Sequence, residues 1–142
     1  ITNGTITELQ GYESLRREVK YGTNSRIDLL LENPGKPPAY VEVKNCHLRR
    51  DGTLAEFPDS VTTRGAKHLD ELAAQVALGN RAVMVFCVQR ADCEAFSVAG
   101  DIDPGYAEAF SRARNAGVEA VAYVCHVSPE EIKVTKSISI QD

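Results

Sequence analysis

Asp28, Glu42 and Lys44 have the types and spacing of a hydrolytic site, and they lie in two short apolar runs joined by a Pro/Gly turn. The runs, residues 27–32 and 39–48, predict two antiparallel strands of a hairpin that turns near Gly35. In such a hairpin the numbers of opposed residues add up to about 70, which places Asp28 across from Glu42. Glu42 and Lys44 share one face because side chains alternate along a strand. A β-bulge would shift this register by one residue.

Two carboxylates this close repel each other unless a cation lies between them. Mg²⁺, or Mn²⁺ in its place, prefers oxygen ligands and would fill that position. The lysine would then contact the attacking water or the phosphate, so the three residues predict phosphodiester hydrolysis. The alternative is a surface hairpin with an ordinary Glu–Lys alternation, which the spacing alone favours.

A second polar cluster, formed by Asp59, Arg64, Lys67 and His68, surrounds the predicted start of a helix. Arg64 and His68 are one helical turn apart and share a face, with Lys67 beside them. A helix N-terminus with three such cations predicts a phosphate-binding site. In the alternative, Asp59 is a local cap, Arg64 pairs with a carboxylate and His68 is a packed surface residue.

The remaining pattern predicts an α/β fold with a mixed β-sheet flanked by helices, because strands and helices alternate after the hairpin. We expect helices or helix-like segments over residues 6–20, 62–79 and 103–117, strands over 81–89 and 119–127, and a short edge strand over 131–140.

Composition limits the classes of protein that fit this chain. Its 142 residues suit one domain, and 43% hydrophobic and 25% charged residues are ordinary for a globular protein. The net charge of −4 argues against a protein that coats nucleic acid non-specifically. Residues 1–68 hold ten Lys/Arg and nine Asp/Glu, whereas residues 69–142 hold six and eleven, so a polyanion would prefer the first half.

The chain shows neither an apolar run of membrane-spanning length nor a signal-peptide pattern at its start, and we expect no membrane association. Its four cysteines form no C-x-x-C pair. They are interpreted as reduced, buried thiols rather than zinc ligands or disulfides, which predicts a cytoplasmic protein. The absence of an initiator Met suggests a fragment or a processed product.

Longer motifs resemble those of one known family. The most specific is F-P-D-x-V-T-x-R-G-x-K-H-L at residues 57–69. Further matches are R-E-V-K-Y-G (17–22), S-R-I-D (25–28), Y-V-E-V-K (40–44), I-D-P-x-Y (102–106) and A-G-V-E (116–119). From about Gly11 onward the chain resembles the sugar fermentation stimulation protein A (SfsA) family, within the restriction-endonuclease-like, PD-(D/E)xK group of nucleases.

The resemblance implies a restriction-endonuclease-like domain over residues 11–142. Residues 1–10 would be a linker or the tail of an N-terminal OB-like domain that this chain lacks. It also implies that Asp28 and Glu42 are metal ligands, that Lys44 is the catalytic lysine, and that Glu18 is a helix-borne acid near the site. Alternatively, Glu18 is an exposed carboxylate paired with Arg17 or Lys20.

Three more arginines are candidates for binding DNA. Arg26 can orient Asp28 or bind phosphate, and Arg49 and Arg50 can form a phosphate-tracking loop, although a solvated loop tip fits them equally well. Two functions remain open, besides a structural module that docks the missing domain. The first is an Mg²⁺-dependent DNA nuclease, and the second is a DNA-binding regulator of sugar (maltose) metabolism with a silent nuclease fold. We expect DNA, the OB-like domain and possible further copies of the chain as partners.

Overall fold

The computed structural model describes all of residues 1–142. Its elements, in chain order, are η1 (Thr7–Leu9), β1 (Ser14–Tyr21), β2 (Ser25–Asn33), β3 (Lys36–Cys46), β4 (Leu54–Phe57), α1 (Thr63–Ala77), β5 (Arg81–Val88), β6 (Ala95–Val98), α2 (Pro104–Ala116), β7 (Glu119–Val127) and β8 (Ile132–Gln141).

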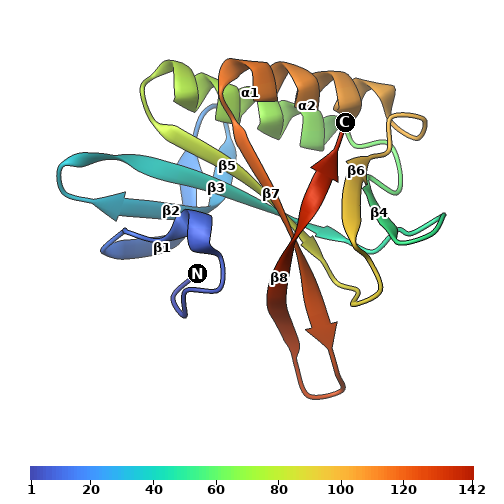
Figure 1. Ribbon diagram of the computed structural model, residues 1–142. Helices are drawn as coiled ribbons and strands as arrows, with labels where there is room; N and C mark the ends of the chain where they lie inside the picture. The colour runs from blue at the N-terminus through green and yellow to red at the C-terminus, as the bar shows by residue number, and fades with distance from the viewer.

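One eight-stranded mixed sheet forms the centre of the molecule, in the order β1-β2-β3-β5-β7-β8-β6-β4. The pairs β1–β2, β2–β3 and β7–β8 are antiparallel, and the other four pairs are parallel. Both helices lie side by side over one face of this sheet, and the β7–β8 hairpin projects away from it (Figure 1). The predicted α/β fold with a mixed sheet and flanking helices is confirmed, with both helices on the same face.

The two helices begin where the sequence predicts, because each has a side-chain cap. The hydroxyl of Thr62 accepts a hydrogen bond from the N–H of Gly65 at the start of α1. At the start of α2 the carboxylate of Asp103 accepts one from the N–H of Tyr106 and a second from the N–H of Thr62. Asp103 therefore caps one helix and holds the N-cap residue of the other.

The predicted helix over residues 6–20 is wrong. Only a short 3₁₀ turn forms there, and residues 14–21 are the edge strand β1, paired with β2 from Ser14↔Glu32 to Tyr21↔Ser25. The apolar residues Leu15 and Val19 are four apart, which fits a helix face and a strand face equally well. Pairing with a neighbouring strand decides between the two.

The C-terminal strand occupies a different position from the one expected. β8 pairs with β7 on one side and with β6 on the other, so it lies inside the sheet. It acquires this place because two four-residue strands that the sequence pattern does not reveal, β4 and β6, extend the sheet beyond it.

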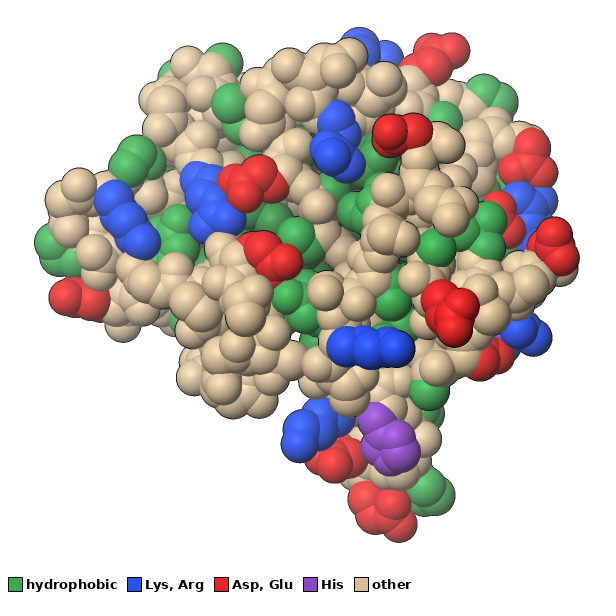
Figure 2. All heavy atoms as spheres, in the orientation of Figure 1, with side chains coloured by type: hydrophobic (Ala, Val, Ile, Leu, Met, Phe, Trp, Pro, Cys, Tyr) green, Lys and Arg blue, Asp and Glu red, His purple; other side chains and the backbone are tan.

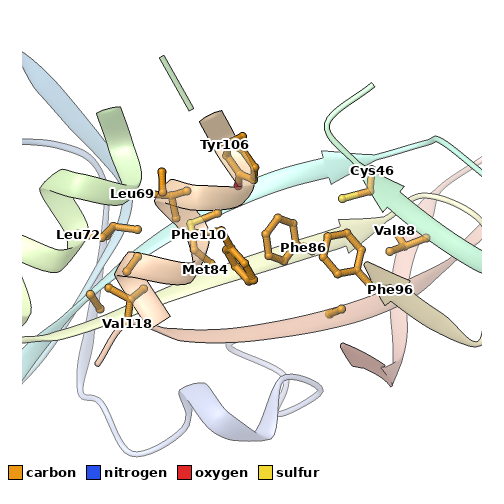
Figure 3. Close-up of a cluster of buried hydrophobic side chains, with 14 of the residues drawn as sticks. Cys46, Leu69, Leu72, Met84, Phe86, Val88, Phe96, Tyr106, Phe110 and Val118 are labelled. Atoms are coloured by element: carbon orange, nitrogen blue, oxygen red, sulfur yellow. The ribbon is translucent and has the colours of Figure 1, made fainter. Parts of the chain in front are cut away.

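Most of the core lies between the helices and the sheet. Leu69 and Leu72 of α1 and Tyr106 of α2 pack with Met84 and Phe86 of β5 in this layer (Figure 3). A smaller cluster on the other face includes Val41, Val83 and the buried side chains of Ile6 and Leu9. The first ten residues therefore cover part of the sheet, and their relation to a preceding domain remains a prediction.

The alternation of β3 determines where its polar side chains point. Tyr40 and Cys46 belong to the core under the helices, whereas Val41 and Val43 belong to the opposite cluster. Glu42 and Lys44 therefore face α1. Neither helix is both long and apolar enough to cross a membrane.

Candidate active site

Asp28 lies where strands β2 and β3 separate. The ladder between them runs from Leu31↔Ala39 to Leu29↔Val41, in the predicted register, and no further pair follows toward Asp28. Instead, Oδ2 of Asp28 accepts a hydrogen bond of 2.7 Å from the backbone N–H of Val43. The carboxylate is thereby fixed beside the neighbouring strand, within reach of Glu42.

Glu42 is the most deeply buried carboxylate of the site, with 4% of its side chain exposed. Its Oε1 lies 3.2 Å from Nζ of Lys44, whereas Oε2 is buried without any hydrogen-bond partner. Burial raises the pKa of the Glu42 carboxyl to about 7; Lys44 and Arg64 lower it, and the negative charge of Asp28 raises it further. Lys44 thus contacts one oxygen of this carboxylate and leaves the other without a partner.

His68 reaches the same carboxylate from helix α1. Its Nδ1 lies 3.0 Å from Oε1 of Glu42 but makes no hydrogen bond, so the contact lacks hydrogen-bond geometry. Burial lowers the pKa of the imidazole, and the positive charges of Lys44 and Arg64 lower it further. His68 is therefore a neutral, buried neighbour of Glu42 at neutral pH rather than an exposed cation for phosphate.

Two residues that the sequence analysis did not select, Tyr21 and Glu71, also belong to this site. Both carry a buried oxygen without a hydrogen-bond partner, the hydroxyl of Tyr21 and Oε2 of Glu71. Glu71 follows His68 by three residues on α1, a spacing that could have revealed it. Tyr21 stands in the R-E-V-K-Y-G motif, but the motif assigns it no chemistry; its place follows from the pairing of β1 with β2, where it lies across from Ser25.

The basic candidates fall into two groups. Arg64 and Lys67 are on α1, where Arg64 influences the pKa of Glu42, and Nζ of Lys67 donates to the carbonyl of Thr23 at 3.1 Å. Arg26 is exposed on β2, across from Lys20 of β1. Lys20 and Arg26 both line a polar pocket of about 430 Å³.

Arg49 and Arg50 are engaged elsewhere. Arg50 donates to both carboxylate oxygens of Glu56 and of Asp101 at 2.6–2.8 Å. Arg49 donates to the carbonyl of Gly52 and lies 3.5 Å from Asp92. None of these partners is a residue of the site around Glu42, so the structure does not bring the two arginines to that site.

Glu18 is exposed on β1, with a left-handed φ of +54°. It is not on a helix, as the resemblance implied, because this segment is a strand. No three His, Cys, Asp or Glu side chains are arranged to hold a metal ion in this structure. The proposed ligands therefore approach one another without forming a closed coordination sphere.

Comparison with known proteins places this geometry in a family. The family model described as "Sugar fermentation stimulation protein RE domain" matches residues 1–131. The chain belongs to this family. It is 59% identical over 140 residues to a sugar fermentation stimulation protein homolog from Rhodospirillum centenum, and 56% identical over 142 residues to one from Brucella ovis.

The family fold is also seen in a solved structure. Pyrococcus furiosus SfsA in complex with Ca²⁺ matches 99% of the chain with a TM-score of 0.88 and 31% sequence identity. In these three matches 99–100% of the chain is aligned. The chain spans about 60% of each relative's length. The activity of the longer family members is therefore a matter for proposal.

Proposed function

We propose that this family domain hydrolyses phosphodiester bonds in DNA with the help of a divalent metal ion. The observation that carries the proposal is Glu42: a buried carboxylate with Lys44 and His68 at one oxygen, Asp28 nearby, and an unpartnered second oxygen. Such a group is costly to bury unless a cation completes its surroundings.

The residues fit a hard divalent cation. Asp28 and Glu42 would hold it, because one oxygen of Glu42 has no partner and Asp28 uses only Oδ2, toward Val43. Oxygen ligands of this kind suit Mg²⁺, Mn²⁺ and Ca²⁺. When bound, the ion would acidify a water molecule and neutralise charge on the phosphate. The Ca²⁺ present in the Pyrococcus furiosus relative is consistent with an ion of this class.

Lys44 is placed to assist at the scissile phosphate. Its ammonium group is held 3.2 Å from Glu42 while 19% of its side chain remains exposed. It is therefore fixed by one carboxylate and still open toward a substrate. An ammonium group in this position donates hydrogen bonds to phosphate oxygens and stabilises the charge that develops on them.

DNA would approach the side of the sheet where α1 begins. Arg64 makes no ion pair or hydrogen bond within the chain, and Arg26 and Lys20 are exposed on the neighbouring hairpin. Figure 2 shows Lys/Arg and Asp/Glu side chains interspersed over one face, without a broad area of a single sign. Affinity would thus depend on a few local cations rather than on the overall charge of −4.

The decisive experiment is incubation of the domain with supercoiled plasmid and with labelled oligonucleotides, in Mg²⁺, Mn²⁺ or EDTA. We expect cleavage that requires the metal and is lost in Glu42→Gln and Lys44→Ala. Glu108→Gln, on the exposed side of α2, is the matched control and should cleave normally. Cleavage that persists in Glu42→Gln would come from a contaminating nuclease and would overturn the proposal.

One observation favours a DNA-binding regulator with a silent site as the second candidate. Lys44 already neutralises Glu42, and no three ligand groups form a metal site. In that case the domain would bind DNA equally well in Mg²⁺ and in EDTA, and would not cleave it. A link to sugar metabolism and a DNA-binding partner domain remain expectations from the family, and a cytoplasmic location remains an expectation from the reduced cysteines.

A further inference from the structure

Four buried polar atoms without hydrogen-bond partners gather on the α1 side of the site. Two of them, Oε2 of Glu42 and Nδ1 of His68, belong to the contact already described between these residues. The other two are the hydroxyl of Tyr21 and Oε2 of Glu71. Buried polar atoms are nearly always hydrogen-bonded, so this concentration indicates an absent polar component.

Glu71 is packed tightly into this position. A Cβ atom at Gly22 would lie 3.1 Å from Cδ and 3.3 Å from Oε2 of Glu71, so the β1–β2 turn leaves no room for a side chain beside this carboxylate. Only 13% of the Glu71 side chain is exposed. The turn is itself attached to α1 through the hydrogen bond from Lys67 to the carbonyl of Thr23. The carboxylate therefore has little freedom to move toward solvent.

The hydroxyl of Tyr21 is buried without a hydrogen-bond partner and is exposed to the charge of three carboxylates. Its pKa is raised by burial first, and then by the negative charges of Glu42, Glu71 and Asp28. The ring packs against Tyr40 with centroids 5.6 Å apart, which fixes its direction. Tyr21 is therefore within electrostatic range of both the Asp28–Glu42 pair and Glu71.

Lys67, on the same helix, does not explain why the carboxylate of Glu71 is buried. Nζ of Lys67 is 3.6 Å from Oε1 of Glu71, a loose ion pair of a half-exposed lysine, and it leaves Oε2 unpartnered. A surface ion pair of this kind contributes little. The burial of a carboxylate here needs another explanation.

We propose that Glu71 is a positioning residue that, together with the Tyr21 hydroxyl, binds water molecules of the hydrated cation held by Asp28 and Glu42. This inference rests on the proposed function. Mg²⁺ keeps several of its waters when it binds to protein carboxylates, and those waters need acceptors. Glu71 supplies an acceptor, and Tyr21 supplies a hydroxyl that both donates and accepts. Action through water agrees with the absence of a three-ligand cluster.

The test is isothermal titration of the metal-free domain with Mg²⁺ and with Mn²⁺. Loss of a group that supports a metal through a hydrogen bond weakens affinity about 10- to 100-fold, and we expect this for Glu71→Gln. The same change at an exposed position, Glu108→Gln, should leave the affinity unchanged. Tyr21→Phe should weaken affinity in the same direction, and it carries the test if Glu71→Gln does not fold.

Thermal unfolding separates this role from a purely structural one. Without metal, Glu71→Gln should melt at the wild-type temperature or above it, because a neutral amide is cheaper to bury than an unpaired carboxylate. Addition of Mg²⁺ should raise the melting temperature of the wild type more than that of the variant, because tighter binding stabilises the folded state more. A structural role would instead lower the metal-free melting temperature and leave the metal affinity intact, which would overturn the inference.

The inference and the proposed function fail in different ways. If the wild type binds neither Mg²⁺ nor Mn²⁺, the proposed function falls and the inference falls with it. If the wild type binds and both Glu71→Gln and Tyr21→Phe bind equally well, the inference alone is overturned.

Discussion

The carboxylate of Asp28 accepts a hydrogen bond from the N–H of Val43 at the point where the β2–β3 ladder ends. The side chain thus takes the place of a backbone carbonyl of the next ladder pair. This contact gives Asp28 a structural role in addition to the proposed metal-binding one, and suitable substitutions separate the two.

Asp28→Asn and Asp28→Ala should differ in stability but not in metal affinity. The amide oxygen of Asn can still accept from Val43, so the free energy of unfolding should stay near that of the wild type. Ala leaves this N–H unpaired and should cost about 1 kcal/mol or more. Both variants remove the charge, and both should bind Mg²⁺ more weakly. Urea unfolding and metal titration measure the two effects, and equal metal affinity of Asp28→Asn and wild type would exclude Asp28 as a ligand.

The affinity for Mg²⁺ should rise with pH around neutrality. Glu42 has a pKa of about 7 without metal, and the ion must displace its proton. Affinity should therefore fall about ten-fold between pH 8 and pH 6. Titrations at several pH values in buffers of different ionisation enthalpy would also detect the released proton. An affinity independent of pH over this range would contradict the role of Glu42.

The stability of the metal-free protein should have the opposite dependence on pH. The pKa of Glu42 is raised above its ordinary value of 4.5, so its contribution to stability is fully present below pH 4.5 and is lost as the pH rises through 7. Between pH 5 and pH 8 the wild type should lose stability relative to Glu42→Gln, which has no such titration. Denaturant unfolding of both proteins in EDTA gives this difference directly.

Arg64 and Arg50 should separate DNA binding from folding. Arg64 makes no ion pair, so Arg64→Ala should leave the melting temperature unchanged, weaken DNA binding, and reduce the slope of log affinity against log salt by about 1. Arg50 joins Glu56 to Asp101, so Arg50→Ala should lower the melting temperature but leave the DNA affinity of the folded protein intact. Fluorescence anisotropy at several salt concentrations and thermal melts measure both, and the reverse pattern would place the DNA elsewhere.

Gly65 and Gly105 both occupy the first turn of a helix but should respond differently to Ala. At Gly65 a Cβ would lie 2.9 Å from Cγ2 of Thr62 and 3.1 Å from the ring of Tyr106, so Gly65→Ala should cost about 1–3 kcal/mol. At Gly105 the nearest atom is at 3.4 Å, and Ala there should be neutral or stabilise by up to about 1 kcal/mol. Chemical denaturation of the pair would test whether α1 and α2 approach as closely as the structure shows.

The hairpin and the helix starts could be predicted because their signals are local. The turn near Gly35 fixes the register at Leu29↔Val41, and Thr62 and Asp103 mark the helix N-termini. The Asp28, Glu42 and Lys44 positions followed from that register. For these elements the local sequence signals agree with the strand pairing that the structure shows.

The rest of the site depends on contacts between segments distant in sequence. Tyr21 and Glu71 approach only because β1 pairs with β2 and α1 lies over β3. The same dependence explains why β4 and β6 were missed: each has four residues, and β6 pairs with residues 139–141. The partners of Arg50 could not be foreseen for a related reason, since one of them, Asp101, lies 51 residues further along the chain.

The position of β8 has a consequence for synthesis on the ribosome. β4 and β6 emerge well before β8, yet β6 can join the rest of the sheet only through β8. Until residues 132–141 leave the exit tunnel, the nascent chain presents the open edges of β7 and β6, which are prone to pairing with other chains. Chaperones that bind nascent chains should therefore remain associated with this domain until its last strand has been released.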